Sequence, residues 1–365
     1  MRAVILCAGN STRTYPLTIS KPKPLLQVLD KTILEHNLDN LIGLVDKVLI
    51  VVGYKAHSIQ AKIGYEYQGM DIDYIFQKER LGTGHALQTT KSKLKNSSGF
   101  LYLLGDNIYS RKDLKNMVIG GHIAVLTDFR KPLDKHGIVH SKSMTTMVEK
   151  ITEPKGEKRT YYCDTGCYLF DKNIFNYKSN YATEMINQYA KDHSVYNINS
   201  MGGWLPITYW WDYLEVNIEL LKQRKMSAYI GENVDIKRTA YMRTPYIIFN
   251  NCKIGGEVYD TLIMENTTAK HHCYLAHSVI GSNCNIGANT ITADYRHDGE
   301  KITTYINDKR VQSQRKKLGA CLGNHVKTAI NTSIDIGRKL YDYSFTYPNE
   351  VVEKDITERD WRKKT

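Results

Sequence analysis

Residues 1–26 read M-R-A-V-I-L-C-A-G-N-S-T-R-T-Y-P-L-T-I-S-K-P-K-P-L-L. The apolar run at residues 3–7 predicts a buried parallel strand near the centre of a sheet. It is followed by a small-residue loop that contains Ala8, Gly9 and Asn10, and then by two cations, Arg13 and Lys23. The backbone N–H groups of such a loop can face a polyphosphate, and the cations can neutralise it.

The loop alone is a weak signal, because Gly9 is its only glycine and no GxGxxG or Walker pattern is present. The prolines that follow strengthen the interpretation. Pro16, Pro22 and Pro24 restrict the chain around Lys23. A preorganised phosphate contact requires such restriction.

Composition limits the classes of function. A length of 365 residues predicts two domains. The longest apolar run, residues 48–52, is too short to cross a bilayer, and the first residues lack the pattern of a signal peptide, so we expect a cytoplasmic protein. The net charge of +12 comes from cations spread along the chain, which favours anionic small substrates over nucleic acid. Seven cysteines without a CxxC pair predict buried thiols and no structural zinc.

The first half of the chain, residues 1–226, alternates apolar runs with helical patterns. The predicted strands are residues 3–7, 48–52, 72–77 and 100–104. One predicted helix covers residues 31–44, and another begins after Gly84 and runs to about Leu94. This alternation predicts an α/β domain with an open, mainly parallel sheet covered by helices on both faces. Ligands of such sheets bind beyond the carboxyl ends of the strands.

The second half, residues 227–365, repeats every six residues. The first series is Ile230, Ile236, Met242, Ile248 and Ile254. After a phase slip the series continues with Leu262, Thr268, Tyr274, Ile280, Ile286 and Thr292, and later with Leu322, Thr328, Ile334 and Leu340. This period predicts a parallel β-helix with one inward side chain on each six-residue side. A charged segment at about residues 299–318 interrupts the repeat and predicts a projecting arm.

The segment from Ala8 to Leu26 resembles the signature of sugar-1-phosphate nucleotidylyltransferases, A-A-G-x-G-T-R-x-x-P-L-T…P-K-P-L. Ser11 stands where this family usually has a second loop glycine, and Asn10 and Ser11 both tolerate turn conformations. Residues 269–295 resemble the acetyltransferase half of bifunctional N-acetylglucosamine-1-phosphate uridylyltransferases, and a later segment matches their archaeal branch. The resemblance implies a Rossmann-like open mixed sheet followed by a left-handed β-helix of hexapeptide repeats, in a homotrimer.

For the first half, the resemblance implies nucleotidyl transfer with release of pyrophosphate. Such a reaction needs cations, a metal ion and alignment more than a covalent nucleophile. Arg13 is expected at the β- and γ-phosphates, and Lys23 between the attacking phosphate and the α-phosphate. Asp106, in L-G-D-N, and Asp212, in W-W-D, are the expected Mg²⁺ ligands. A helix cap or turn would also explain Asp106 by itself.

The family pattern also implies residues for the base and the sugar. Gln77, Gly82 and Thr83 belong to Q-x-x-x-x-G-T-G-H-A, which resembles the uridylyltransferase form. A Gln side chain has a donor and an acceptor for the edge of uracil or thymine. The expected sugar contacts are Gly137, Glu153 and Asp164, with Glu149-Lys150 as an alternative to Glu153 and Lys155. Asp164 stands where the family has an amide, which removes two donors.

For the second half, the resemblance implies acetyl transfer from acetyl-CoA. His271 would be the general base, since an imidazole titrates in the useful range. The implied contacts to the acceptor sugar phosphate are Arg243, Tyr274, Asn285 and Tyr295, and Ala320 would lie along acetyl-CoA. Two positions depart from the family, because Tyr259 replaces a lysine and Asp294 replaces an asparagine.

The sequence therefore predicts a Mg²⁺-dependent enzyme that transfers a uridylyl or thymidylyl group to N-acetylglucosamine 1-phosphate or glucose 1-phosphate. Acetyl transfer to glucosamine 1-phosphate is a further expectation. One alternative is a hexapeptide-repeat acyltransferase with a degenerate first half. Another is a non-catalytic nucleotide-sugar-binding subunit that uses the repeats for assembly. No nucleic-acid or membrane partner is expected.

Overall fold

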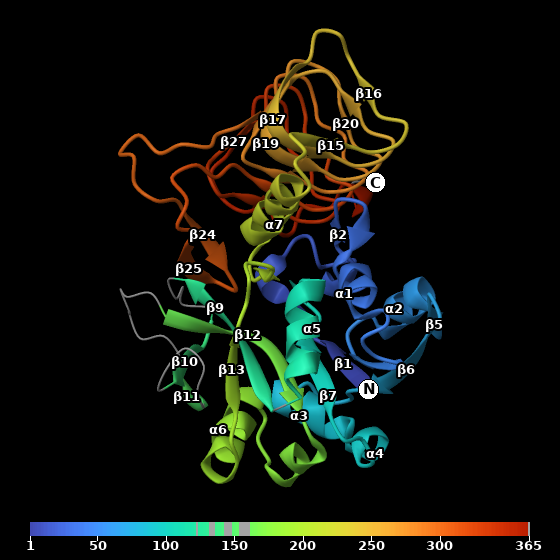
Figure 1. Cartoon of the computed structure of the whole chain (residues 1–365). Helices are drawn as coiled ribbons and strands as arrows, with labels where there is room; N and C mark the ends of the chain where they lie inside the picture. Colours follow the sequence, from blue (N-terminus) through green and yellow to red (C-terminus); the bar gives the residue numbers. More distant parts are fainter. Residues whose placement is uncertain (122, 131–135, 142–147, 153–160, 364–365) are drawn as a thin grey trace. The chain divides into compact units, whose positions relative to one another are not determined.

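A computed structural model describes residues 1–121, 123–130, 136–141, 148–152 and 161–363 (Figure 1). The chain forms two compact units. The first contains Met1–Asn10, Pro22–Gln27 and Lys31–Pro206, and the second contains Ser11–Lys21, Val28–Asp30 and Ile207–Thr365. Part of the signature segment thus folds with the second half of the chain. The predicted domain boundary at residue 226 stays a prediction.

The centre of the first unit is a parallel sheet. Its central strands are β1 (Arg2–Cys7), β4 (Lys47–Val52), β6 (Met70–Phe76) and β7 (Phe100–Leu104). β1 lies between β4 and β7 and pairs in parallel with both, and β4 pairs in parallel with β6. The prediction of a central first strand is therefore confirmed. The carboxyl ends of these four strands meet at one edge.

Further strands make the sheet mixed. They are β5 (Glu66–Tyr67), β9 (Ala124–Arg130), β10 (Ile138–Ser141), β11 (Val148–Thr152), β12 (Tyr161–Phe170) and β13 (Tyr196–Asn199). β12 is antiparallel to β7, β9 and β10, and β5 is antiparallel to β6. Four shorter strands form two separate sheets of two strands each: β2 (Gln27–Val28) pairs with β3 (Lys31–Thr32), and β8 (Asn107–Ile108) pairs with β14 (Leu205–Pro206).

Helices cover both faces of the sheet, as predicted. α1 (Ile33–Leu41), α2 (Ala56–Ile63) and α5 (Arg111–Gly120) pack in one apolar cluster with Ala3, Ile5 and Cys7. α3 (Thr83–Thr89), α4 (Lys91–Leu94), α6 (Ala182–Asp192) and the 3-10 turn η3 (Lys172–Asn176) pack in a second cluster with Val4 and Ala8. Alternate residues of β1 thus serve opposite faces.

Both predicted helices have different bounds in the structure. The first begins at Ile33, because the Thr32 hydroxyl accepts the backbone N–H of Glu35 and the Glu35 carboxylate accepts that of Thr32, a capping box. The second begins at Thr83 and divides at Thr90 into α3 and α4. The Thr90 hydroxyl donates to the Leu87 carbonyl there, and such back-bonding competes with regular helix.

The second unit consists mainly of short strands, preceded by α7 (Trp210–Gln223). Its strands are β15 (Ala228–Ile230), β16 (Asp235–Ile236), β17 (Tyr241–Ile248), β18 (Lys253–Ile254), β19 (Glu257–Ile263), β20 (Thr268–Ala269), β21 (Tyr274–Ala276), β22 (Val279–Ile280), β23 (Ile291–Thr292), β26 (Cys321–Leu322), β27 (Ser333–Ile334), β28 (Lys339–Leu340) and β29 (Val351–Val352). The pairings between them are parallel. We refer to these strands as the stack.

The core of the stack corrects the phase of the predicted repeat. Ile248, Ile254, Ile280, Ile286, Leu322, Ile334 and Leu340 lie in one buried cluster, as predicted. In the middle of the repeat, however, the core contains Ile263, Ala269 and Leu275. The prediction of Leu262, Thr268 and Tyr274 as inward residues was wrong by one position. Leu262 is buried outside this cluster, and a one-residue shift moves a strand side chain to the opposite face.

The first residue of the predicted repeat, Ile230, lies outside the core. Ile230 is 49% exposed, because β15 pairs only with β17 among the described strands.

The interruption of the repeat contains an antiparallel hairpin of β24 (Thr303–Ile306) and β25 (Lys309–Gln312). We call residues 303–312 the arm. The 3-10 turns η1 (Thr12–Thr14), η2 (Lys23–Leu25) and η4 (Trp361–Lys363) complete the described elements. No helix within the described ranges is long and apolar enough to cross a membrane.

Candidate active site

The loop after β1 leaves its backbone open. Ala8 is buried, whereas Gly9 is exposed, and a Cβ atom added to Gly9 would meet nothing within 4 Å. Asn10 accepts a hydrogen bond of 2.6 Å on its Oδ1 from the Arg80 guanidinium. Sequence reasoning missed Arg80, although a cation just before the G-T-G-H-A motif is a signal that could have found it.

An ion pair lies at the carboxyl end of β7. Asp106 follows this strand by two residues, and its Oδ2 lies 3.0 Å from Nζ of Lys23. Lys23 is 2% exposed, whereas the Asp106 side chain is 35% exposed. Gly105 allows this arrangement, because a Cβ atom there would lie 2.6 Å from the Leu6 carbonyl oxygen. The structure therefore brings together Lys23, predicted from the signature, and Asp106, predicted from L-G-D-N.

Asp106 fits a divalent cation better than Asp212 does. Carboxylate oxygens are the ligands that Mg²⁺ prefers, and the carboxylate of Asp106 is accessible from solvent. Asp212, in the second unit, is buried in the first turn of α7, and its Oδ2 accepts the backbone N–H groups of Thr208 and Tyr209 at 2.9 and 2.8 Å. Asp212 thus acts as a helix cap in this structure. No cluster of three or more His, Cys, Asp or Glu ligands occurs in the described residues.

The residues predicted to contact the base lie close together in the first unit. Gln77 follows β6 and is 4% exposed. Its Nε2 lies 3.2 Å from the Gly82 carbonyl oxygen and 3.0 Å from Nδ1 of His85. Thr83 receives two contacts, since its hydroxyl accepts the backbone N–H of Ala182 and its carbonyl accepts the Tyr102 hydroxyl. The predicted block is therefore one connected group, which includes His85 of the same motif.

The predicted sugar residues Gly137 and Asp164 are adjacent. The backbone N–H of Asp164 donates to the Gly137 carbonyl at 2.8 Å, and the buried Asp164 carboxylate accepts the Tyr168 hydroxyl at 2.6 Å and the Gly166 N–H at 2.9 Å. Burial raises the pKa of Asp164 from 3.8 to about 6, against the lowering effect of these two hydrogen bonds. Tyr168 is a partner that the sequence did not indicate.

Glu153 and Lys155 lie outside the described residues. Glu149 and Lys150 belong to β11, of which the backbone alone is described at these positions. The choice between these two pairs therefore stays open.

Burial raises the pKa of the Tyr102 hydroxyl, and the Asp164 and Asp106 carboxylates add to this rise.

Arg13 lies in the second unit, on a tightly bonded turn. Ser11 has a φ of 55°, the left-handed conformation in which a glycine is usual. Its carbonyl oxygen accepts the hydroxyls of Thr14 and Thr18, at 2.8 and 2.9 Å. Both threonines are fully buried, whereas Arg13 is exposed. The loop therefore keeps a defined shape without the second glycine.

The predicted acceptor residues lie on outward positions of the stack. Arg243 and Tyr259 face each other in β17 and β19, with the guanidinium 4.4 Å from the Tyr259 ring centre. Arg243 also lies 3.4 Å from the Glu257 carboxylate. Glu257 in turn is paired with Tyr274 of the next strand, β21. This cluster combines a cation with aromatic and acidic groups on one surface.

The remaining predicted residues of the second half differ in accessibility. His271, Asn285 and Tyr295 are exposed, the last at 53%. Ala320 is fully buried in the core of the stack, and its backbone N–H donates to the Ser278 hydroxyl. The roles of these residues stay predictions.

A largely buried ladder of aspartate and histidine side chains was missed by sequence reasoning. Asp260, His277 and Asp294 follow one another at 17-residue intervals. Nδ1 of His277 is hydrogen bonded to Asp260, and its Nε2 lies 3.2 Å from Oδ2 of Asp294. Arg315 adds a contact of 2.9 Å to Asp260. The pKa of Asp260 is lowered, because the bonds and charges of His277 and Arg315 outweigh its burial.

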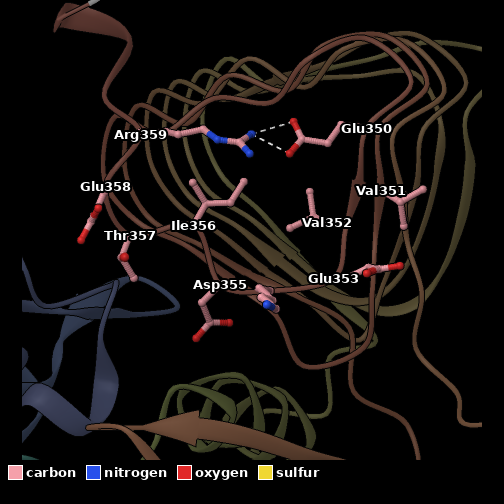
Figure 2. Close-up of a pocket in the computed structure, with 10 residues that line it drawn as sticks. Glu350, Val351, Val352, Glu353, Asp355, Ile356, Thr357, Glu358 and Arg359 are labelled. Carbon is pink, nitrogen blue, oxygen red and sulfur yellow. Dashed lines mark hydrogen bonds and ion pairs between the residues drawn. The ribbon is translucent and has the colours of Figure 1, made fainter.

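Figure 2 shows a cavity of about 460 Å³ at the last turn of the stack. It is lined by one continuous segment, residues 350–359, and contains none of the predicted site residues. Val352 and Ile356 are members of the core, and Arg359 pairs with both oxygens of Glu350 at 2.6 and 2.7 Å. The cavity is thus the inner surface of a terminal turn and not a part of the candidate site.

Similarity to known proteins identifies the family of this chain. The family model described as nucleotidyl transferase matches residues 2–223. The chain belongs to this family. The enzyme class predicted from the signature, a nucleotidyltransferase, is therefore confirmed.

Relatives of this family match nearly the whole chain. "Bifunctional protein GlmU" of Methanococcus vannielii is 31% identical over 98% of this chain and 96% of its own length. A "bifunctional sugar-1-phosphate nucleotidylyltransferase/acetyltransferase" of Sulfurisphaera tokodaii is 28% identical over 98% of both. Among solved structures, a UDP-glucose pyrophosphorylase from Acinetobacter baumannii matches 62% of this chain and 95% of its own, with a TM-score of 0.56 and 19% identity. This last likeness concerns the fold alone.

Proposed function

We propose that this member of the nucleotidyl transferase family transfers a uridylyl or thymidylyl group from a nucleoside triphosphate to a sugar 1-phosphate. N-acetylglucosamine 1-phosphate and glucose 1-phosphate are the proposed acceptors. The observation that carries the proposal is the Lys23–Asp106 pair at the carboxyl end of the central strands. Similarity to the bifunctional sugar-1-phosphate nucleotidylyltransferase/acetyltransferase of Sulfurisphaera tokodaii supports the choice of substrate class.

Each residue has a separate task in this proposal. The open backbone beside Gly9 would bind phosphate oxygens. Arg13 would bind the β- and γ-phosphates, and Lys23 would align the attacking phosphate with the α-phosphorus. The group of Gln77, Gly82 and Thr83 would hold the base. Gly137 and Asp164 would contact the sugar.

Asp106 would hold Mg²⁺, with Asp212 as the second proposed ligand. When bound, the ion neutralises charge that develops on the phosphate oxygens. Lys23 already neutralises the Asp106 carboxylate at 3.0 Å. The carboxylate that would hold the ion thus lies directly beside the cation proposed to contact substrate phosphate.

The test is release of pyrophosphate by the purified protein. UTP and dTTP are each supplied with Mg²⁺ and with each sugar 1-phosphate in turn. The expected result is release that needs both substrates. An absence of release with every combination would overturn the proposal, and the ratio of kcat/KM values would name the nucleotide and the sugar.

Acetyl transfer to glucosamine 1-phosphate is the second candidate. The surface of Arg243, Glu257, Tyr259 and Tyr274 favours it, because it presents a cation beside hydroxyls and a carboxylate. In this proposal exposed His271 would take a proton from the acceptor amine. Asn285 and Tyr295 would contact the acceptor, and acetyl-CoA would bind along the backbone at Ala320, which directly precedes β26.

Release of free thiol from acetyl-CoA, in the presence of glucosamine 1-phosphate, tests this second activity. His271→Ala should lower the rate about a hundredfold or more, as expected for a general base. His272→Ala is the matched control, since the neighbouring His272 is also exposed. Equal losses in the two variants would count against His271 as the base.

We also propose that the stack is a left-handed parallel β-helix that assembles as a homotrimer in the cytoplasm. The six-residue repeat and the parallel pairing of its strands support the β-helix. Sedimentation of the intact protein tests the trimer, and a monomer at micromolar concentration would overturn it.

A further inference from the structure

The signature segment is attached to the stack by side chains from several of its turns. Ser20 accepts a hydrogen bond of 2.7 Å from Asn324, and Lys21 lies 3.5 Å from the Glu265 carboxylate. The ring of Tyr15 meets that of Tyr341 edge to face. These contacts lie within the second unit, to which Ser11–Lys21 belongs. The turn that bears Arg13 is therefore folded against the second half of the chain.

A further contact to this segment comes from the arm. Its two-residue turn consists of Asn307 and Asp308, which have φ values of 47° and 62°. Such values fit the tight hairpin turn that asparagine favours. The Nδ2 atom of Asn307 donates to Oγ1 of Thr12 at 2.9 Å. Thr12 directly precedes Arg13.

The arm is itself held firmly by the stack. Ile302 and Ile306 are buried, the Thr304 hydroxyl donates to the Gly337 carbonyl at 2.6 Å, and Lys339 donates to the Tyr305 carbonyl at 2.5 Å. Where the chain returns from the arm, Arg315 contacts Asp260 at 2.9 Å. The ladder of Asp260, His277 and Asp294 thus anchors the base of a hairpin whose turn contacts Thr12.

We propose that the arm positions the signature turn for nucleotidyl transfer, with Asn307 and Thr12 as the positioning pair. This inference rests on the proposed function of Arg13. Hydrogen bonds from Thr14 and Thr18 fix one side of the turn, and Asn307 fixes it at Thr12. An exposed arginine on a loosened turn spends less time at the phosphates, and small displacements reduce rates strongly.

The experiment is a double-mutant cycle on pyrophosphate release. Asn307→Gly removes the amide but keeps a residue that favours positive φ, and Thr12→Val removes the acceptor oxygen at similar size. Each variant should raise the KM for the nucleoside triphosphate about threefold to tenfold, as expected for one hydrogen bond. The double variant should be no worse than either single variant. The KM for the sugar 1-phosphate should stay unchanged.

Two controls separate positioning from general damage. Asn251→Gly is matched, because Asn251 also has a positive φ of 60° and donates to another asparagine, Asn266, at 3.1 Å. It should leave the KM for the nucleotide unchanged. Thr12→Ser keeps the hydroxyl and should behave as wild type. Additive losses in the double variant, or equal increases in both KM values, would overturn the proposal.

Amide hydrogen exchange of residues 11–21 provides a readout that does not need activity. Asn307→Gly should speed exchange in this segment at least threefold, and Asn251→Gly should not. Unchanged exchange would overturn the positioning role. If the wild-type protein released no pyrophosphate while exchange changed as expected, the proposed function would fail and the structural coupling would stand.

Discussion

The sheet of the first unit and the stack of the second place their polar residues by different means. Asp106 and Gln77 follow strands that are separated in the sheet by β1 and β4, and they reach one edge because these strands run in parallel. Asp260, His277 and Asp294 recur every 17 residues, in successive turns of one repeat. A site on the sheet can therefore lose its chemistry while the fold persists, whereas a change in the core of the stack affects the fold itself.

The largest expected effect concerns the sheet. Asp106→Asn keeps the size of the side chain but removes the charge that would bind Mg²⁺. We expect kcat for pyrophosphate release to fall about a thousandfold. The matched control is Asp73→Asn, whose carboxylate lies 3.0 Å from Lys47 in the same sheet. Full activity of Asp106→Asn would contradict the assignment of Asp106. An equal loss of activity in both variants would mean that the effect is not specific to Asp106.

The second prediction concerns the core of the stack. Ile280 is fully buried, whereas Ile230, at an earlier position of the repeat, is 49% exposed. Ile280→Ala should lower the free energy of unfolding by about 2–5 kcal/mol, through lost burial and a cavity. Ile230→Ala should lower it by less than about 0.5 kcal/mol. Urea unfolding measures both, and similar costs would show that the repeat is packed differently.

Two glycines of the first unit allow the fold and the chemistry to be separated. A Cβ atom at Gly105 would lie 2.6 Å from a backbone oxygen, whereas at Gly9 it would meet nothing. Gly105→Ala should therefore destabilise the protein by about 1–3 kcal/mol. Gly9→Ala should leave the midpoint of thermal unfolding unchanged and lower kcat/KM about tenfold, because a methyl group would obstruct the approach of phosphate. Full activity of Gly9→Ala would remove this loop from the proposed phosphate site.

The smallest expected effect is a pH dependence at Asp164. Burial raises its pKa from 3.8 to about 6, so the folded state binds this proton more tightly than the unfolded state. The resulting stabilisation is present below about pH 4 and is lost as the pH rises to 6. In Asp164→Asn the free energy of unfolding should no longer depend on this titration. Between pH 4 and pH 7, the stability of the variant relative to wild type should therefore rise by roughly 1–3 kcal/mol. Denaturant unfolding at both pH values measures it, and parallel profiles would contradict the raised pKa.

Local patterns were sufficient to predict much of the sheet. The apolar runs at residues 3–7 and 100–104 are long enough to identify buried strands, and the helical patterns between them require parallel pairing. The signature correctly predicted the family. The signature also named Lys23, and the L-G-D-N motif named Asp106; the structure brings these two residues to 3.0 Å. The capping role of Asp212 could not be seen, because it depends on the backbone of residues 208 and 209.

The repeat was predicted with less accuracy. Its period was clear, but its phase between residues 255 and 279 was wrong, because Leu262 is as apolar as Ile263 and both are buried. A shift of one residue turns a strand side chain to the other face. The ladder of Asp260, His277 and Asp294 was missed for the same reason, since its members align only in the observed register.

The sequence by itself determined the family, the alternation of strands and helices, and the six-residue period, because each depends on residues close together in the chain. The tertiary structure alone decided which side chains meet. It placed Ser11 in a left-handed turn, and it placed Asn307 against Thr12 across 295 residues. Contacts at such separations depend on how whole elements pack, and no local pattern of apolar and polar residues encodes them.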